Sequence, residues 1–142
     1  MNPLDKLLKW KEDSAEHLKT GDWGEARAAR LLKAKGYRIL GRNVRVGTRD
    51  EVDLVARDKN ILVFVEVKTR RRVDFGRPIA AVNAKKKHVL SRAAVRYLKK
   101  LGFPPVCIRF DVVEITGTPD TGELDINHVE NAFQLDRRYT LP

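Results

Sequence analysis

The chain has 142 residues, which is enough for one domain with a hydrophobic core. It contains no run near the roughly 20 apolar residues of a membrane-spanning helix, and its N-terminus lacks the apolar core of a signal peptide. We therefore expect a cytoplasmic protein without a membrane partner. The 29 Lys and Arg against 19 Asp and Glu give a net charge of +10, which favours a polyanionic partner, with nucleic acid ahead of a membrane surface. Many small cytoplasmic proteins are basic, so the charge by itself indicates nothing more specific.

Two helices are predicted at the start of the chain. Residues 1–20 have apolar side chains near one stripe, which indicates an amphipathic helical extension. A second helix is predicted from Asp22 to Lys35. Its start has the capping-box spacing of Asp22 and Glu25, and Gly36 suits the left-handed conformation that ends a helix.

The rest of the chain predicts strands around one further helix. Pro78 suits the first turn of a long helix that ends near Gly102. The predicted strands are residues 37–46, 52–56, 61–69 and 106–115, with a short run at 124–129. This order predicts an α/β domain with a mixed central sheet flanked by helices. The domain occupies residues 21–135, and residues 136–142 form a tail.

The predicted strand over residues 61–69 carries two charges in an apolar element. Glu66 and Lys68 are two residues apart, so their side chains project from the same face of the strand. A buried charge is costly without a partner or a metal. A second carboxylate, Asp53, lies within the preceding apolar run.

Asp58, Lys59 and Asn60 separate these two runs and predict a hairpin turn. If Lys59 and Asn60 form a two-residue loop, Asp53 lies opposite Glu66, with Cβ atoms roughly 5 Å apart. A three-residue loop without a bulge would turn the two carboxylates to different faces. A metal site requires the first register, or a four-residue or bulged equivalent.

Two interpretations of these charges compete. A cross-strand salt bridge on a half-exposed sheet is common and contributes little stability. However, both runs are apolar almost throughout, which indicates cover on both faces. Two carboxylates that converge under cover repel each other unless a proton or a cation lies between them. We therefore predict a Mg²⁺ (or Mn²⁺) site held by Asp53, Glu66 and the backbone carbonyl of Val67. Lys68 would orient or deprotonate a water at the metal and stabilise charge on a phosphate.

Glu25 is a further candidate for this site. It shares a helical stripe with Ala28, Ala29 and Leu32, so it points in the direction of the buried face. It also completes the predicted capping box, and periodicity favours neither role over the other.

Basic residues follow the predicted site directly in the sequence. Arg70, Arg71 and Arg72 come after Lys68, so we expect their charges beside the site. Contacts of such residues with phosphates give affinity without sequence information. Since there is no base-reading motif, we expect recognition of DNA shape rather than of sequence.

A second basic group lies on the long predicted helix. Lys85, Arg92 and Arg96 fall on one flank of the helical wheel and are further candidates for nucleic-acid binding. For this flank alone, an ordinary solvated face is the simpler interpretation.

Other polar residues carry weaker signals. We expect Cys107 to be a small buried residue and Arg109 to form a local ion pair with Asp111. The three histidines show no metal-ligand spacing, and we predict no role for them.

Several segments together resemble a known protein family. They are Gly24-Glu25, residues 36–40, Asn43, residues 51–56, residues 64–70, Phe75-Gly76, residues 109–113 and residues 131–133. In these segments the chain resembles the YraN-like family, a bacterial group with a restriction-endonuclease-like fold, over residues 20–135. The Glu66-x-Lys68 core is also similar to that of archaeal Holliday-junction resolvases.

The resemblance implies a fold and roles for individual residues. Glu25, Asp53, Glu66 and Lys68 fall on the acidic, metal-ligand and lysine positions of the nuclease superfamily. Asp50 stands where relatives usually carry Gly, and Val52 where the superfamily has Pro, but neither change removes a ligand. Because related resolvases act as dimers, a homodimer is also implied.

Three functions follow from these observations. The first is a metal-dependent endonuclease that acts on branched or otherwise structured DNA, with DNA preferred to RNA. The second is a non-catalytic nucleic-acid-binding accessory protein with the same fold, serving recombination or RNA metabolism. The third is a structural partner in a protein complex, for which the N-terminal helix is the only local indication.

Overall fold

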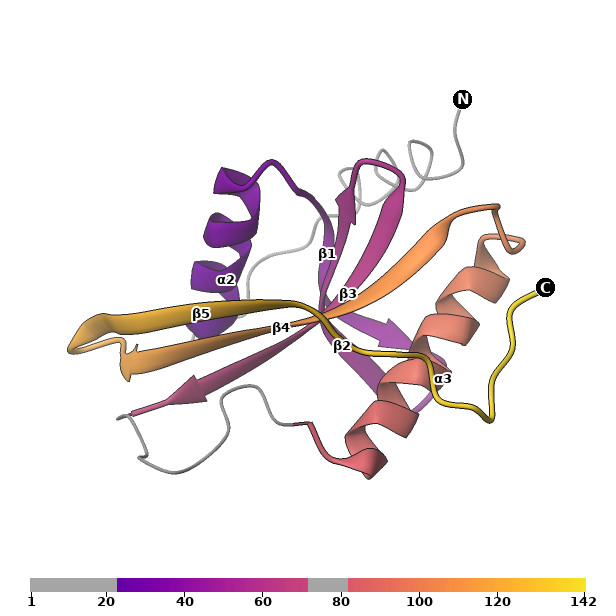
Figure 1. Ribbon diagram of the computed structural model, residues 1–142. Coiled ribbons are helices and arrows are strands. Elements are labelled where there is room, and N and C mark those ends of the chain that lie inside the picture. Colours follow the sequence, from indigo (N-terminus) through magenta and orange to yellow (C-terminus); the bar gives the residue numbers. More distant parts are fainter. Residues whose placement is uncertain (1–22, 72–81) are drawn as a thin grey trace.

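The structure is a computed structural model that describes residues 23–71 and 82–142 (Figure 1). The predicted helical extension over residues 1–20, the predicted helix start at Pro78, and Arg72 lie outside the described residues. The elements follow the predicted order: α2 (Trp23–Ala34), β1 (Arg38–Val46), β2 (Asp50–Asp58), β3 (Ile61–Arg70), α3 (Ala84–Lys100), β4 (Cys107–Thr118) and β5 (Gly122–Phe133).

The strands of the described chain form one mixed sheet in the order β1-β2-β3-β4-β5. Strands β3 and β4 run parallel, whereas the other neighbours run antiparallel. Helices α2 and α3 lie on opposite sides of the sheet (Figure 1). A mixed sheet covered by helices confirms the predicted fold class and is compatible with a restriction-endonuclease-like fold.

The central strand β3 is apolar because both of its faces are covered. Leu62 and Phe64 belong to the core beneath α3, and Val63 and Val65 belong to the core beneath α2. Alternate residues of a strand face opposite sides of a sheet, so a strand between two helical layers loses the usual polar alternation. Glu66 and Lys68 continue the face of Phe64, just beyond the apolar stretch.

Glycines in the left-handed conformation follow both helices. The N–H groups of Gly36 (φ 93°) and Tyr37 donate to the carbonyls of Lys33 and Leu32, which is a Schellman motif and confirms the predicted helix stop. Helix α3 ends in the same way at Gly102. Its described start follows the N-cap Asn83, whose side chain accepts the backbone N–H of Lys86 at 2.8 Å.

Strand β5 is longer than the predicted run over residues 124–129, and it contains a bulge. Phe110 pairs with Phe133 and Val112 with Val129, so Asp111 alone faces three residues of β5. Asn131, within the bulge, has a left-handed backbone (φ 51°). The bulge therefore lies directly opposite the carboxylate of Asp111.

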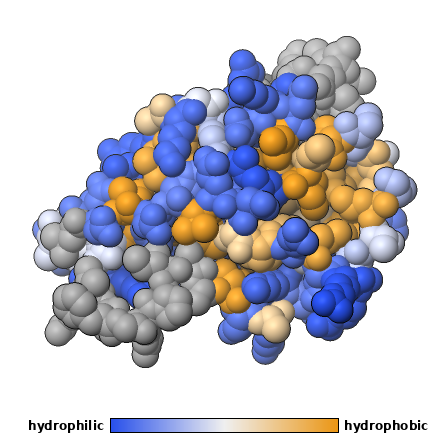
Figure 2. All heavy atoms as spheres, in the orientation of Figure 1, coloured by the Kyte–Doolittle hydropathy of each residue, from blue (hydrophilic) through white to orange (hydrophobic). Residues whose placement is uncertain are grey.

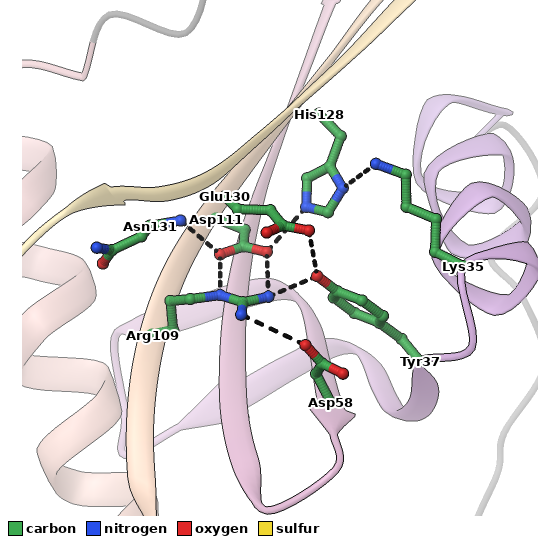
Figure 3. A network of polar contacts seen from close by, with 8 residues as sticks. All are labelled: Lys35, Tyr37, Asp58, Arg109, Asp111, His128, Glu130 and Asn131. Carbon is green, nitrogen blue, oxygen red and sulfur yellow. Dashed lines mark hydrogen bonds and ion pairs between the residues drawn. The ribbon is translucent and has the colours of Figure 1, made fainter.

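Asp111 is the centre of a polar network on the α2 side of the sheet (Figure 3). Its fully buried carboxylate accepts the Nε–H of Arg109 at 2.8 Å and the backbone N–H of Asn131 at 3.0 Å. His128 Nε2 lies 2.8 Å from the same carboxylate. The ion pair between Arg109 and Asp111 is thus confirmed, and His128, for which no role was predicted, belongs to the network.

The network also reaches the segment between α2 and β1 and the β2–β3 hairpin. The Arg109 guanidinium contacts Asp58 and the hydroxyl of Tyr37, and that hydroxyl donates to Glu130 at 2.9 Å. Lys35 Nζ lies 2.9 Å from Nδ1 of His128. These contacts join three strands, β2, β4 and β5, to the segment between α2 and β1.

The segment after β5 packs along α3 (Figure 1). The backbone N–H of Asp136 donates to Ser91 Oγ at 2.9 Å, and the rings of His88 and Tyr139 stack with centroids 5.5 Å apart. Cys107 is exposed, so the prediction of a buried residue is wrong. The reason is that the buried part of β4 begins only at Phe110. None of the helices in the described ranges is long and apolar enough to cross a membrane.

Candidate active site

The hairpin between β2 and β3 has the two-residue loop that a shared carboxylate site requires. Asp58 pairs with Ile61, and the register continues to Leu54 opposite Val65. Lys59 takes the left-handed conformation (φ 55°) that tight hairpin turns need. Of the two registers considered from the sequence, this is the one that directs Asp53 towards Glu66.

Asp53 lies where β2 leaves the regular ladder with β3. Its Oδ2 accepts the backbone N–H of Val67 at 2.8 Å, so a side-chain oxygen takes the place of a strand carbonyl. The sequence predicts the carbonyl of Val67 near this carboxylate as a metal ligand. The contact observed is made by the N–H of the same residue.

The alternation of side chains between the two faces of β2 is interrupted at Asp53. Val52 packs in the core beneath α3, whereas Leu54, two residues later, packs in the core beneath α2. On β1, Asn43 lies opposite Asp53 and has a left-handed backbone (φ 47°), which Asn tolerates better than most residues. Both strands therefore bend at one level of the sheet, and the bend releases the Asp53 side chain from the regular pleat.

Asp53 and Glu66 are electrostatically coupled. Burial, followed by the negative charge of Asp53, raises the pKa of Glu66 to about 7. Burial also raises the pKa of Asp53, against the opposing effects of the Val67 N–H and of the charge on Lys86. The structure thus brings the two carboxylates together at a site where full ionisation of both is unfavourable.

Glu25 approaches Asp53 from the first turn of α2. Its side chain lies close enough to Asp53 to affect the pKa of that carboxyl, so it points inwards, while the other half of the predicted capping box, Asp22, lies outside the described residues. A Cβ atom on Gly24 would lie 2.3 Å from Cγ2 of Thr69. Only glycine allows α2 to approach β3 this closely, and this approach carries Glu25 to the site.

Lys68 and Arg70 lie beside a buried acid on β4. Lys68 is the parallel partner of Glu114, which is 5% exposed. The Nε of Arg70 lies 3.1 Å from Oε1 of Glu114. Sequence patterns do not single out Glu114, because it lies inside an apolar run whose alignment with β3 is defined only by the sheet.

The predicted nucleic-acid-binding residues divide into two groups. Arg92 makes two hydrogen bonds to the buried carboxylate of Asp50, at 2.7 and 2.8 Å, and Arg96 Nη1 lies 3.6 Å from the same group. These two residues and Arg70 are engaged in ion pairs with acidic side chains of the protein, whereas Arg71 and Lys85 are exposed. Hydrophilic residues cover much of the face seen in Figure 2.

Lys86 is a site residue that the sequence analysis missed. Its Nζ lies 3.4 Å from Oε1 of Glu66. Glu66 therefore forms an ion pair with a residue of α3, in addition to any charge interaction between strands β2 and β3. One signal was available: a positive charge in the first turn of a helix is disfavoured by the helix dipole. A lysine at such a position indicates a partner outside the helix.

The oxygen donors of this site fit a divalent cation. Two neighbouring carboxylates, one of which raises the pKa of the other, are relieved by Mg²⁺ or Mn²⁺ between them. Within residues 23–71 and 82–142, no group of three or more His, Cys, Asp and Glu side chains is placed to hold a metal ion. A cation at Asp53 and Glu66 would therefore take further ligands from the backbone, water or a substrate, as Mg²⁺ commonly does.

The chain is similar to a set of bacterial proteins. The model of "Uncharacterised protein family UPF0102" matches residues 24–115, a range that includes Glu25, Asp53, Glu66 and Lys68. A UPF0102 protein of Symbiobacterium thermophilum is 50% identical over 115 residues, which cover 81% of this chain and 96% of the relative. UPF0102 proteins of Syntrophomonas wolfei and Geobacter sulfurreducens are 48% and 46% identical, covering 80% and 79% of this chain and 96% and 86% of the relatives.

Proposed function

The chain belongs to the uncharacterised protein family UPF0102, the YraN family, and we propose that it is a metal-dependent endonuclease of the cytoplasm that cleaves structured or branched DNA. The observation that carries this proposal is the neighbouring pair of carboxylates Asp53 and Glu66, with Glu25 beside Asp53 and Lys68 two residues after Glu66 on the same strand.

Each side chain has a task in phosphodiester hydrolysis. A divalent cation bound at Asp53 and Glu66 would supply Lewis-acid chemistry at the scissile phosphate. The hydrogen bond from the Val67 N–H fixes the orientation of the Asp53 carboxylate. Lys68 stabilises negative charge that develops on the phosphate, or orients the attacking water.

The charge of the protein supports a nucleic-acid substrate. A net charge of +10 favours a polyanion, and exposed Arg71 and Lys85 are available for phosphate contacts. Such contacts do not read bases, so the proposed selectivity is for the shape of the DNA. The restriction-endonuclease-like arrangement makes DNA a better candidate than RNA, by analogy of fold.

The test is a cleavage assay on a panel of substrates of matched sequence. Linear duplex, single-stranded DNA, a four-way DNA junction and the equivalent RNA are incubated with protein and Mg²⁺ or Mn²⁺. We expect nicks in at least one DNA structure, and loss of all nicking in Asp53→Asn, in Glu66→Gln and in the presence of a chelator. Asp120→Asn, an exposed acid in the β4–β5 turn, is the matched control and should retain activity.

Two other outcomes are informative. Nicking that persists unchanged in both site variants would identify a contaminating nuclease and contradict the proposal. Salt-sensitive binding that survives Asp53→Asn, without cleavage of any substrate, would instead identify the accessory nucleic-acid-binding function.

A further inference from the structure

Helix α3 starts with an unusual concentration of positive charge. Ala84 is followed by Lys85, Lys86 and Lys87, and the first turn contains no acidic residue. The N-terminus of a helix favours negative charge, so these lysines are unfavourable for the helix itself. The N-cap Asn83 accepts the backbone N–H of Lys86, whereas the side chain of Lys86 forms an ion pair with Glu66 on β3.

Lys86 directs its charge at both carboxylates of the candidate site. Nζ lies 3.4 Å from Oε1 of Glu66, and the same charge acts on Asp53. It is therefore a cation already present where the proposed divalent cation would bind. Two cations at one carboxylate repel each other, so the ion pair with Lys86 weakens the binding of a divalent cation to Glu66.

Lys86 is placed so that it can move. Its side chain is 42% exposed, whereas that of Glu66 is 13% exposed. An ion pair with one exposed partner is weak, and the four-carbon stem of lysine allows the ammonium to swing without movement of the helix.

We propose that Lys86 acts as an exchangeable cation of this site: it pairs with Glu66 while the metal is absent and is released to a substrate phosphate when the metal binds. The inference rests on the proposed function and adds a residue of α3 to a site otherwise built from α2, β2 and β3. A DNA backbone would then meet the ammonium that the metal has displaced. Metal binding would thereby prepare the site for its anionic substrate.

The test compares lysines that are adjacent in the chain. Lys86→Met removes the charge and keeps the length of the side chain, Lys86→Arg keeps the charge, and Lys87→Met is the matched control. Mn²⁺ binding is measured by calorimetry without DNA. Binding of a four-way DNA junction is measured by fluorescence anisotropy in Ca²⁺ over a range of salt concentrations.

We expect Lys86→Met to bind Mn²⁺ about tenfold more tightly than wild type, because a competing charge has been removed. The same variant should bind the junction more weakly, with the slope of log affinity against log salt reduced by about 1. Lys86→Arg should restore the wild-type values, and Lys87→Met should leave Mn²⁺ affinity within about twofold of wild type.

Other results would overturn the inference. Unchanged or weaker Mn²⁺ binding in Lys86→Met would show that the lysine does not compete with the metal. Tighter Mn²⁺ binding with an unchanged salt slope would contradict its release to phosphate. If wild-type protein shows no Mn²⁺ binding that Asp53→Asn abolishes, the proposed function fails together with the inference. If that binding is present but Lys86→Met equals Lys87→Met, the inference fails alone.

Discussion

The backbone N–H of Val67 donates to Oδ2 of Asp53 at 2.8 Å, so the proposed metal ligand also closes the hydrogen-bonding pattern between β2 and β3. A substitution at Asp53 can therefore act on the sheet, on the chemistry, or on both. The two effects are separable, because an amide oxygen can accept this hydrogen bond without carrying a charge.

Asp53→Asn should unfold with a free energy within about 1 kcal/mol of wild type, since the amide keeps the contact with Val67 and removes the repulsion with Glu66. Asp53→Ala leaves the Val67 N–H without this acceptor and should cost about 1–3 kcal/mol. Both variants should lose Mn²⁺ binding. The measurements are urea denaturation in a chelator and calorimetry with Mn²⁺. Equal destabilisation by Asn and Ala would show that the contact with Val67 contributes nothing to stability.

Glu66 should make the stability of the metal-free protein depend on pH. Burial and the charge of Asp53 raise its pKa to about 7 in the folded protein, above the unfolded value of about 4.3. Between these values the folded state binds more protons than the unfolded state, so stability falls as the pH rises and remains lower above pH 7.

Glu66→Gln removes this dependence. The free energy of unfolding of the variant, relative to wild type, should increase by about 2–3 kcal/mol between about pH 4.5 and pH 8. Chemical denaturation in a chelator across this pH range provides the measurement. Asp120→Asn is the control, and its free energy of unfolding relative to wild type should not change with pH. If the free energy of unfolding of Glu66→Gln relative to wild type is also independent of pH, the pKa of Glu66 is not raised in the folded protein.

Gly24→Ala should disturb the approach of α2 to β3. The added Cβ would lie 2.3 Å from Cγ2 of Thr69, and Thr is stiff at χ1. We expect a loss of about 1–3 kcal/mol from this overpacking, together with weaker Mn²⁺ binding because Glu25 moves with the helix.

Removal of the threonine methyl provides the control for this effect. With Cγ2 gone, the next contact of the added Cβ is the Cβ of residue 69 at 3.7 Å, an ordinary separation. The double variant Gly24→Ala/Thr69→Ala should therefore be at least as stable as Thr69→Ala alone. A double variant that shows the full loss of both single changes would indicate that the steric contact is not the cause.

The hairpin could be predicted from the sequence because its determinants are local. Asp58 to Asn60 favour a tight turn, and once the loop length is fixed at two residues the pairing of β2 with β3 follows. The apolar run over residues 61–67 likewise indicated cover on both faces, since a strand exposed on one face would alternate. The charges of Glu66 and Lys68 then stand out against that background.

The contacts that could not be predicted depend on where distant elements pack. Lys86 reaches Glu66 only because α3 crosses the sheet at that level, and Glu114 faces Lys68 only through the parallel register of β4. The change of alternation at Asp53 requires a bend shared by β1 and β2, whereas a sequence pattern assumes a regular pleat. His128 gave no signal because its partner Asp111 lies on another strand.

Asp111→Asn should be strongly destabilising, by about 3–5 kcal/mol at neutral pH, because it removes the charge that Arg109 and His128 surround.

The loss in Asp111→Asn should also depend on pH. Although burial alone would raise the pKa of Asp111, hydrogen bonds from His128, Arg109 and the Asn131 N–H hold this pKa below its usual range. A carboxyl with a depressed folded pKa contributes stability above its unfolded pKa of about 3.9 and loses it as the pH falls through the folded value. The difference between wild type and Asp111→Asn should therefore be constant from neutral pH to about pH 5 and shrink below about pH 4. Asp125→Asn, an exposed acid on β5, is the control and should stay within about 0.5 kcal/mol of wild type. A difference that stays constant down to acid denaturation would assign the loss to hydrogen-bond geometry rather than to the charge of Asp111.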